Sequence, residues 1–513
     1  MEQQGFLKEE EIHTLDQELL IHRLLIENTG LKAENQELRE QLAYWKKIVY
    51  GRKSEKTETI MENGEQLSIF DEAEQEAEIS PKAVQTMIQV KPHQRKKRTR
   101  DELMADLPVE EVIHSTENKI CDRCGAEMTV IGREKIRDEL VYIPARLFLR
   151  RHIAEVVKCS ACGRDETRDA KLPDIEPCYI RRADVPAPMI PHSFCSPELL
   201  AHIVYEKYGN AMPLYRLEKD FIAKGAQISR TTMANRVIYA AETWVKPVWK
   251  QMHQQLMASA VIHADETVVK VLHETGRKAK SPSRMWVYCS GRYHMHSNIL
   301  FEYQPTRNGD HAAKFLEGYS NYLVCDGYDG YNKLKTAVRC GCRAHVRRKF
   351  VDALPASKEL LSTSAAAKGV EFCNKLFELE REFADLTPED RRSERHIRSE
   401  PLLHAFFAWL DSITVSGGTK LAKTVSYAKA EKKYLCRFLE SPDIPIDNNR
   451  AENAIRPFVI GRKNWLFSAS AKGAEASAMI YSVAATACAN GLHIEDYFTR
   501  LFSQPPGSFI LPW

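Results

Sequence analysis

The order of predicted secondary structure between residues 260 and 326 constrains the fold of this 513-residue chain more than any other feature. A β-rich segment spans Ala260–Leu272, and two further strand-like segments follow at Met285–Cys289 and Asn298–Tyr303. A helix near Asp310–Tyr319 then precedes a short strand at Tyr322–Cys325. Three strands, a helix and a strand in this order predict an α/β domain.

Two carboxylates stand out in this pattern. The period of two in a strand puts His263, Asp265 and Thr267 on one face of the first strand and Glu266 on the other. Asp326 follows directly after the fourth strand. The order is that in which a ribonuclease-H-like fold opens, where a carboxylate midway along the first strand lies beside one at the end of the fourth. We therefore expect Asp265 and Asp326 to be neighbours, and Glu266 to face away from them.

A third carboxylate is expected at Glu452. Asp447 or Asn448 can cap a short helix that contains Glu452 and that Pro457 ends. Magnesium is a hard ion that takes oxygen ligands, and a two-metal site must neutralise both the attacking and the leaving oxygen on phosphorus. The predicted catalytic site therefore holds two Mg²⁺ (or Mn²⁺) ions on Asp265, Asp326 and Glu452.

Four of the thirteen cysteines have a diagnostic spacing. Cys121 and Cys124 form one Cys-x-x-Cys knuckle, Cys159 and Cys162 form another, and each knuckle is followed by a glycine. Four thiolates suit one tetrahedral zinc ion, so residues 106–175 are predicted to form a structural zinc module. The alternative is two unrelated pairs of reduced thiols. Even if zinc binds, a closed four-cysteine site is structural and indicates nothing about catalysis.

The N-terminal residues have the pattern of a dimerisation helix. Within residues 12–56, Leu24, Leu31 and Leu38 fall at d positions of a heptad, and Asn28 and Asn35 fall at a positions, where paired asparagines fix the register of a parallel coiled coil. The alternative is an amphipathic helix that docks on its own chain. Residues 57–105 are acidic and then basic, which indicates a linker whose basic run either contacts phosphates or is solvated.

Residues 190–252 are predicted to be helical. Pro197 and Pro213 suit first turns, and Ser229 can cap a helix that presents Arg230 and Arg236. Three helices in this order are typical of a helix-turn-helix that places a helix in the major groove of DNA, although three packed helices are also common in other proteins.

The net charge of +3 carries no information about partners, so nucleic-acid binding depends on local clusters. The N-terminus is acidic and polar, unlike a secretory signal, and no apolar run is long enough to span a membrane. We expect a cytoplasmic protein without a membrane partner, in which the small-residue-rich run 476–489 forms a buried helix.

Several motifs together resemble one family. They are GRKSEK at 51–56, the two cysteine knuckles, HADET at 263–267, CDGYDGY at 325–331, GCRAH at 341–345, DNNRAE at 447–452, IRP at 455–457 and GRKNWLF at 461–467. Taken together, they resemble the transposases of the insertion sequence sixty-six family, within the DDE superfamily. The chain departs from the family pattern at Arg343, where tryptophan is expected, and before Pro213, where histidine is more frequent.

The resemblance implies a function and a domain plan. Asp265, Asp326 and Glu452 become the DDE triad of a catalytic domain at 258–470, with a helical insertion at about 351–440 and a C-terminal helical domain at 471–513. The partners implied are double-stranded DNA at the element ends and at the target, a second copy of the chain in a homodimer or higher oligomer, and small accessory proteins encoded nearby.

Basic and aromatic residues near the motifs are candidates for DNA contact. His345 belongs to a Cys-x-x-His signature with Cys342, and either residue could instead bind metal or orient the fold. Trp465 can stack on a base or fill the core. The predicted DNA-contact residues are Arg230, Arg236, His345, Arg347, Arg348, Arg456, Arg462, Lys463 and Trp465.

The sequence thus predicts a DNA transposase that cleaves and joins strands. Two alternatives stay open: a ribonuclease-H-like nuclease that hydrolyses DNA without strand transfer, and a zinc-dependent DNA-binding regulator whose catalytic domain has decayed. Joined products would separate transposase from nuclease, and an unaffected Asp265→Ala variant would reveal the regulator.

Overall fold

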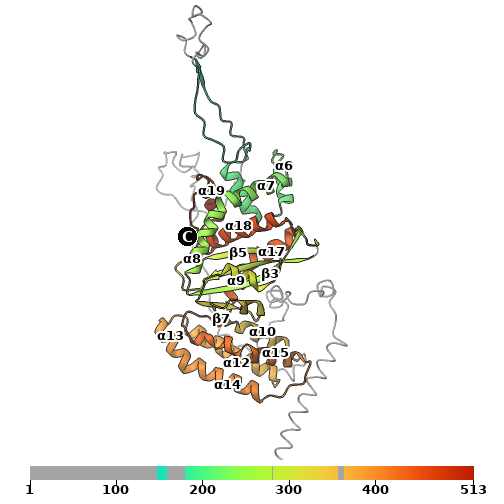
Figure 1. Ribbon diagram of the computed structural model, residues 1–513, viewed down its shortest axis with the longest axis vertical. Coiled ribbons are helices and arrows are strands. Elements are labelled where there is room, and N and C mark those ends of the chain that lie inside the picture. The colour runs from blue at the N-terminus through green and yellow to red at the C-terminus, as the bar shows by residue number, and fades with distance from the viewer. Residues whose placement is uncertain (1–146, 159–179, 280, 356–362) are drawn as a thin grey trace, which may run out of the picture. The chain divides into compact units, whose positions relative to one another are not determined.

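The computed structural model describes residues 147–158, 180–279, 281–355 and 363–513 (Figure 1). The predicted coiled coil, the linker and the four zinc cysteines lie outside these residues. Strands β1 (Val156–Lys158) and β2 (Ile180–Arg182) pair antiparallel in one compact unit, and residues 186–513 form a second compact unit. The rest of this section concerns the second unit.

A mixed sheet forms the centre of this unit. Its strands are β3 (Val261–His273), β4 (Pro282–Ser290), β5 (Ile299–Gln304), β6 (Tyr322–Cys325) and β7 (Val338–Gly341). They lie in the order β5-β4-β3-β6-β7, in which β4 is antiparallel to β3 and β5, and β6 is parallel to β3 and β7. Helix α9 (Gly309–Phe315) connects β5 to β6. The predicted order of three strands, a helix and a strand is confirmed, whereas β7 was not predicted.

The central strand, β3, is buried along most of its length. Val261, Ile262 and Ala264 are buried on one part of the strand, and Val269 and Val271 on another. These buried apolar residues lie on either side of the polar run Asp265–Thr267, so the strand carries both core and site residues. The short strand β8 (Ser468–Ser470) pairs parallel with the end of β3.

The C-terminal residues pack on the sheet instead of forming a separate domain. Helix α18 (Ala471–Ala489) lies along β5 (Figure 1), where Ser482 Oγ accepts a hydrogen bond from Phe301 N at 2.7 Å and Thr486 Oγ1 accepts one from Ile299 N at 2.9 Å. Its alanine-rich surface lets the helix approach the strand closely, and the prediction of a buried helix here is confirmed. Helix α19 (Ile494–Phe502) follows and packs on α5.

The helical segment before the sheet belongs to the same unit. It comprises α5 (Pro197–Val204), α6 (Leu214–Ala223), α7 (Arg230–Ala240) and α8 (Lys246–Met257), with π-helical turns at Tyr205–Gly209 (η1) and Ala241–Val245 (η2). Ser229 caps α7 as predicted, because its Oγ accepts a hydrogen bond from Thr232 N at 3.1 Å. The fully buried Trp244 of η2 donates from Nε1 to Gln504 O at 2.9 Å, which connects this segment to the C-terminus.

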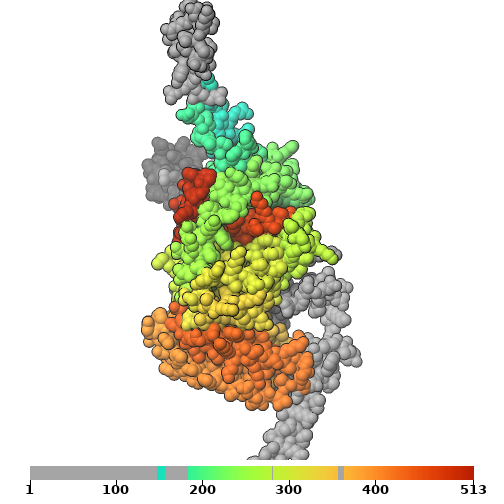
Figure 2. Space-filling model, viewed as in Figure 1, coloured from blue at the N-terminus to red at the C-terminus, as the bar shows by residue number. Residues whose placement is uncertain are grey.

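A layer of helices follows β7. It contains α10 (Arg343–Asp352), α12 (Ala365–Glu382), α13 (Pro388–Glu394), the π-helical turn η4 (Arg395–Ser399), α14 (Glu400–Ser412), α15 (Lys420–Ala430), α16 (Lys432–Leu435) and η5 (Arg437–Leu439). Figure 1 shows this helical layer beyond β7, at the edge of the sheet opposite α18, and Figure 2 shows the residues of the layer in orange. Phe350, Phe406, Leu410 and Phe438 lie in its apolar core. Helix α17 (Asn449–Trp465) then returns to β3.

Candidate active site

The pairing of β3 with β6 brings the first two predicted carboxylates together. His263 on β3 is opposite Val324 on β6 in a parallel register, and Asp265 and Asp326 each lie two residues further along. Glu266 N donates to Asp265 Oδ1 at 2.8 Å, and Tyr328 N donates to Asp326 Oδ1 at 3.0 Å. Both carboxylates are half-buried, Asp265 within β3 and Asp326 directly after the last residue of the adjacent β6.

Asn448 anchors the helix that carries the third carboxylate. Its side chain is completely buried and donates from Nδ2 to Ala264 O at 2.9 Å, while Oδ1 accepts from His263 Nδ1 at 3.1 Å. Burial lowers the pKa of His263 to about 4, so the ring is neutral at physiological pH. These bonds fix the start of α17 beside β3, with Glu452 one turn further on and only 4 % exposed.

The three carboxylates influence one another electrostatically. Burial raises the pKa of Asp265 well above its usual value, and the negative charges of Glu266, Asp326 and Glu452 raise it further. Carboxylates that repel one another are difficult to ionise together, and a bound cation relieves their repulsion. Asp265 therefore lies within electrostatic range of both Asp326 and Glu452.

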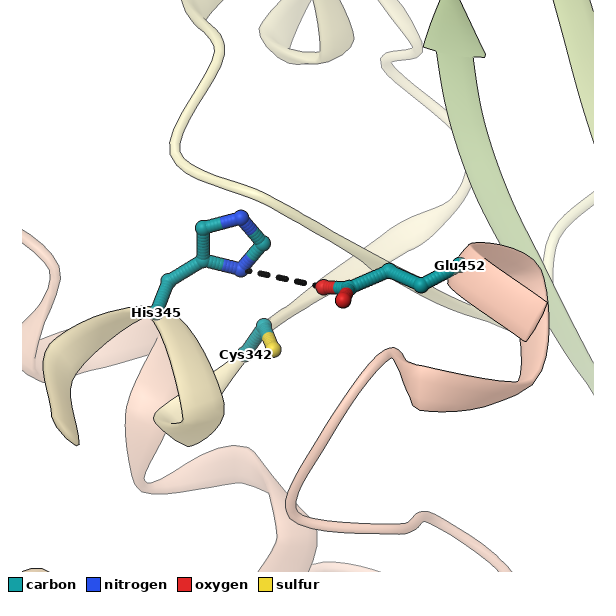
Figure 3. A group of neighbouring side chains, drawn as sticks. All are labelled: Cys342, His345 and Glu452. Carbon is teal, nitrogen blue, oxygen red and sulfur yellow. Dashed lines mark ion pairs between the residues drawn. The ribbon is translucent and has the colours of Figure 1, made fainter. Parts of the chain in front are cut away.

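Two side chains of α10 face Glu452, and Figure 3 shows one of them, His345. Arg348 Nη2 donates to Glu452 Oε2 at 3.2 Å, and His345 Nδ1 lies 3.7 Å from Glu452 Oε1. Neither His345 Nδ1 nor Glu452 Oε1 has a hydrogen-bond partner in the part of the chain that the structure describes. Arg348 thus holds one oxygen of Glu452, while the other is buried without a hydrogen bond.

Glu266 has a different environment from its neighbour Asp265. Arg307 Nε donates to Glu266 Oε1 at 2.7 Å, and the hydroxyl of Tyr331 donates to Oε2 at 2.8 Å. Glu266 is therefore engaged in a buried ion pair, in keeping with the expectation that it does not share a metal face with Asp265.

The predicted DNA-contact residues differ in how exposed their side chains are. Arg230 on α7 and Arg456 and Lys463 on α17 are exposed. Arg236 and His345 are half-buried, the latter beside Glu452. The exposed group is accessible to a ligand as large as DNA.

The remaining predicted contacts have partners within the chain. Arg347 Nε donates to Asn374 Oδ1 at 2.8 Å. Arg462 Nη1 donates to Thr267 Oγ1 at 3.1 Å and to Val268 O, which ties α17 to β3. The ring of Trp465 packs edge-on against Phe458, with 5.5 Å between ring centroids. Arg347, Arg462 and Trp465, like Arg348, thus make structural contacts in this state of the protein.

The predicted end of the Glu452 helix at Pro457 is wrong. Helix α17 continues to Trp465, and Leu466 ends it with a backbone φ of 64°. An internal proline removes one backbone hydrogen bond and costs about 3 kcal/mol. Phe458 and Val459, which are buried directly after it, outweigh this cost by packing against the sheet.

Sequence reasoning missed two residues that position the site. Arg450 donates from Nε to Ser290 O at 2.5 Å and from Nη2 to Ser297 Oγ at 3.1 Å, and thereby joins α17 to β4. Asn448 was considered only as a cap, yet it makes no side-chain cap bond and instead bridges to β3. The run Asp447-Asn-Asn-Arg450 was the available signal, because four consecutive polar residues before a predicted buried helix need partners.

Three family models match this chain. The model described as "Transposase IS66 family" matches residues 192–476, and the model described as "Transposase C of IS166 homeodomain" matches residues 37–112. The "zinc-finger binding domain of transposase IS66" matches residues 118–163, which include all four knuckle cysteines. These matches support the predicted leucine zipper and the structural zinc module.

The chain is also similar to curated proteins of Sinorhizobium fredii. "Uncharacterized protein y4hP" is 26 % identical over 90 % of this chain and 86 % of its own, and "Uncharacterized protein y4jD" is 26 % identical over 93 % and 94 %. Among solved structures, the "Drosophila P element transposase strand transfer complex" aligns with a TM-score of 0.34 and 11 % identity over 59 % of this chain and 94 % of that chain. Among the described residues, no helix is both long and apolar enough for a membrane span.

Proposed function

We propose that this chain, which belongs to the transposase IS66 family, binds the ends of its insertion sequence and catalyses metal-dependent strand cleavage and strand transfer. The observation that carries the proposal is the placement of Asp265, Asp326 and Glu452 at the junction of β3, β6 and α17. The strand order β5-β4-β3-β6-β7 further supports a ribonuclease-H-like core with a DDE triad.

The donor set fits magnesium or manganese. All three side chains offer carboxylate oxygens, which hard divalent cations prefer, and Glu452 Oε1 is buried without a hydrogen bond. We assign two ions per active site to Asp265, Asp326 and Glu452. When bound, such ions lower the pKa of the attacking water and neutralise charge on the attacking and leaving oxygens.

The surrounding residues orient this set. Arg348 holds Glu452 Oε2 and the Tyr328 N–H holds Asp326 Oδ1, so each carboxylate keeps an oxygen for a ligand. Arg456 is exposed one turn beyond Glu452 on α17, where it can contact a phosphate near the scissile bond. We propose direct DNA contacts for the exposed residues Arg230, Arg456 and Lys463, and supporting contacts for Arg236, His345, Arg347, Arg462 and Trp465.

The assembly follows from the N-terminal modules. A leucine zipper at 12–56 would pair two copies of the chain, so that one cytoplasmic complex holds both element ends. One structural zinc ion on Cys121, Cys124, Cys159 and Cys162 would shape a module that recognises those ends. Small accessory proteins encoded nearby complete the proposed set of partners.

The test uses a plasmid that carries the gene with its flanking element ends. Purified protein with magnesium should release 3′-hydroxyl ends and give joined products, and Asp265→Ala and Glu452→Gln should abolish both. Without magnesium or manganese, the wild type should be inactive.

Each alternative function predicts a different result. Cleavage without joining would indicate that the protein is a ribonuclease-H-like nuclease and not a transposase. DNA binding without any reaction, even with the neighbouring accessory proteins, and with no effect of Asp265→Ala would indicate a zinc-dependent regulator.

A further inference from the structure

A second group of potential metal ligands lies beside the proposed active site (Figure 3). Cys342 is at the N-cap position of α10 and His345 is one turn into the same helix, while Glu452 faces them from α17. The Cys342 Sγ, one His345 ring nitrogen and one Glu452 carboxylate oxygen all lie within 4.8 Å of one another.

Two polar atoms of this group have no hydrogen-bond partner among the described residues. Glu452 is 4 % exposed and its Oε1 has no hydrogen-bond partner, and the same holds for His345 Nδ1. A buried polar atom without a partner destabilises the folded protein. Two such atoms 3.7 Å apart, facing one another, indicate a place for a ligand that binds both.

The three donors select a class of cation. Sulfur, imidazole nitrogen and a single carboxylate suit zinc and similar borderline transition ions, whereas magnesium avoids sulfur. Cys342 and His345 are three residues apart, so the helical turn places both on one side of α10. Asn448 N donates to Cys342 Sγ at 3.2 Å, which fixes the position of the sulfur near Glu452.

We propose that Cys342, His345 and Glu452 form a zinc site, and that zinc bound there inhibits the transposase by withdrawing Glu452 from the catalytic magnesium set. Binding releases the thiol proton of Cys342 to solvent and leaves a fourth position on the ion for water. Two ligands of one zinc ion lie about 3–4 Å apart. The ligand atoms of this group lie within 4.8 Å of one another, and a rotation of the half-buried His345 ring brings them to the shorter spacing. The inhibitory role rests on the proposed function, whereas the zinc site itself does not.

The first experiment counts zinc ions on the full-length protein. Equilibrium dialysis followed by elemental analysis should find one more zinc per chain in the wild type than in Cys342→Ser or His345→Gln. Zinc affinity at this site should fall by more than about 100-fold, since loss of a mere outer-shell partner already costs 10–100-fold. Cys340→Ser is the matched control, because Cys340 is an equally buried thiol two residues earlier whose Sγ bonds Val338 O. It should bind zinc as the wild type does.

A Cys121→Ser/Cys124→Ser variant separates the two zinc sites, since it should lose the knuckle zinc and keep the second. Equal zinc counts in the wild type, Cys342→Ser and His345→Gln would overturn the proposal.

The second experiment measures inhibition. Zinc added to the magnesium-dependent cleavage reaction should inhibit the wild type and Cys340→Ser at the same concentration, and should inhibit His345→Gln only at a concentration about 100-fold higher. Equal inhibition of all three proteins would overturn the inhibitory role. Asp265→Ala should keep the second zinc ion although it cannot cleave, so a failure of the proposed function and a failure of the zinc site give different results.

Discussion

Buried charged side chains are fully hydrogen-bonded in the helical layer but only partly hydrogen-bonded at the proposed active site. In the layer, Arg395 is 2 % exposed and every nitrogen of its guanidinium is bonded: Nε and Nη2 to the two carboxylate oxygens of Glu380 at 2.8 and 2.6 Å, and Nη1 to Phe438 O and Ser441 O, each at 2.9 Å. At the site, Glu452 is equally buried, but only one of its oxygens accepts a hydrogen bond.

The difference separates two uses of a buried ionisable group. A fully bonded pair such as Arg395–Glu380 holds η4 against α12 and leaves nothing for a ligand. A cluster of carboxylates with an open oxygen destabilises the metal-free fold and gains its stability from a bound cation. The comparison makes opposite predictions about what substitution does in the two regions.

The largest expected effect is at Asp265. Asp265→Asn should lower the cleavage rate at least ~1000-fold, since several kcal/mol of transition-state stabilisation are lost. Without added magnesium the same variant should unfold at a higher temperature than the wild type. Burial and neighbouring carboxylates raise the pKa of Asp265, so the wild type loses stability as the pH rises through that value, and the advantage of the variant should grow with pH. Thermal unfolding at pH 5 and pH 8 measures this, and a variant less stable at pH 8 would contradict the account.

The opposite result is expected in the helical layer. Arg395→Met leaves the half-buried Glu380 without its partner, which costs at most about 3–5 kcal/mol. The unfolding midpoint in urea should fall accordingly at any pH between 6 and 8. A midpoint like that of the wild type would show that the bonded pair contributes no more than an apolar contact.

A carboxylate outside the site sharpens the comparison further. Glu302 on β5 also has a buried oxygen without a hydrogen bond among the described residues, and burial raises its pKa to about 7. A raised pKa means that stability is lost as the pH rises from the unfolded value towards 7, so Glu302→Gln should increase the unfolding temperature more at pH 8 than at pH 5. The cleavage rate should stay that of the wild type, because Glu302 is not one of the proposed ligands. A loss of cleavage would show that Glu302 contributes to the reaction although it is not a proposed ligand.

The smallest effect is expected at Arg398, three residues after Arg395 in the same π-helical turn. Its Nη2 bonds Glu382 Oε2 at 2.6 Å, but both side chains are exposed, so solvent screens the pair. Arg398→Ala should lower the free energy of unfolding in urea by less than about 1 kcal/mol. A shift as large as that of Arg395→Met would mean that burial does not set the difference between the two arginines.

The sequence predicts those parts of the site that depend on local pattern. Alternation and β-branched residues locate β3, and the order of elements places Asp326 beside Asp265. Glu452 was found because its motif resembles that of a known family, since nothing local distinguishes it from other glutamates in helices.

The parts that could not be predicted depend on distant packing. The bond between Arg348 and Glu452 joins residues 104 positions apart, and that between Asn448 and Ala264 joins residues 184 apart. No periodicity carries such information. The continuation of α17 through Pro457 was missed for the same reason, because the buried contacts of Phe458 and Val459 override a local rule that normally holds.

The position of the helical layer in the chain has a consequence for when the protein becomes active during its synthesis. Asp265 and Asp326 leave the ribosome first, and Glu452 follows 126 residues after Asp326, once the whole layer has been made. At about 5–20 residues per second, this interval lasts roughly 6–25 seconds. An incomplete chain that ends within the layer carries two of the three carboxylates and no complete site. Under the proposed function, such truncated products would not cut the DNA of the cell that makes them.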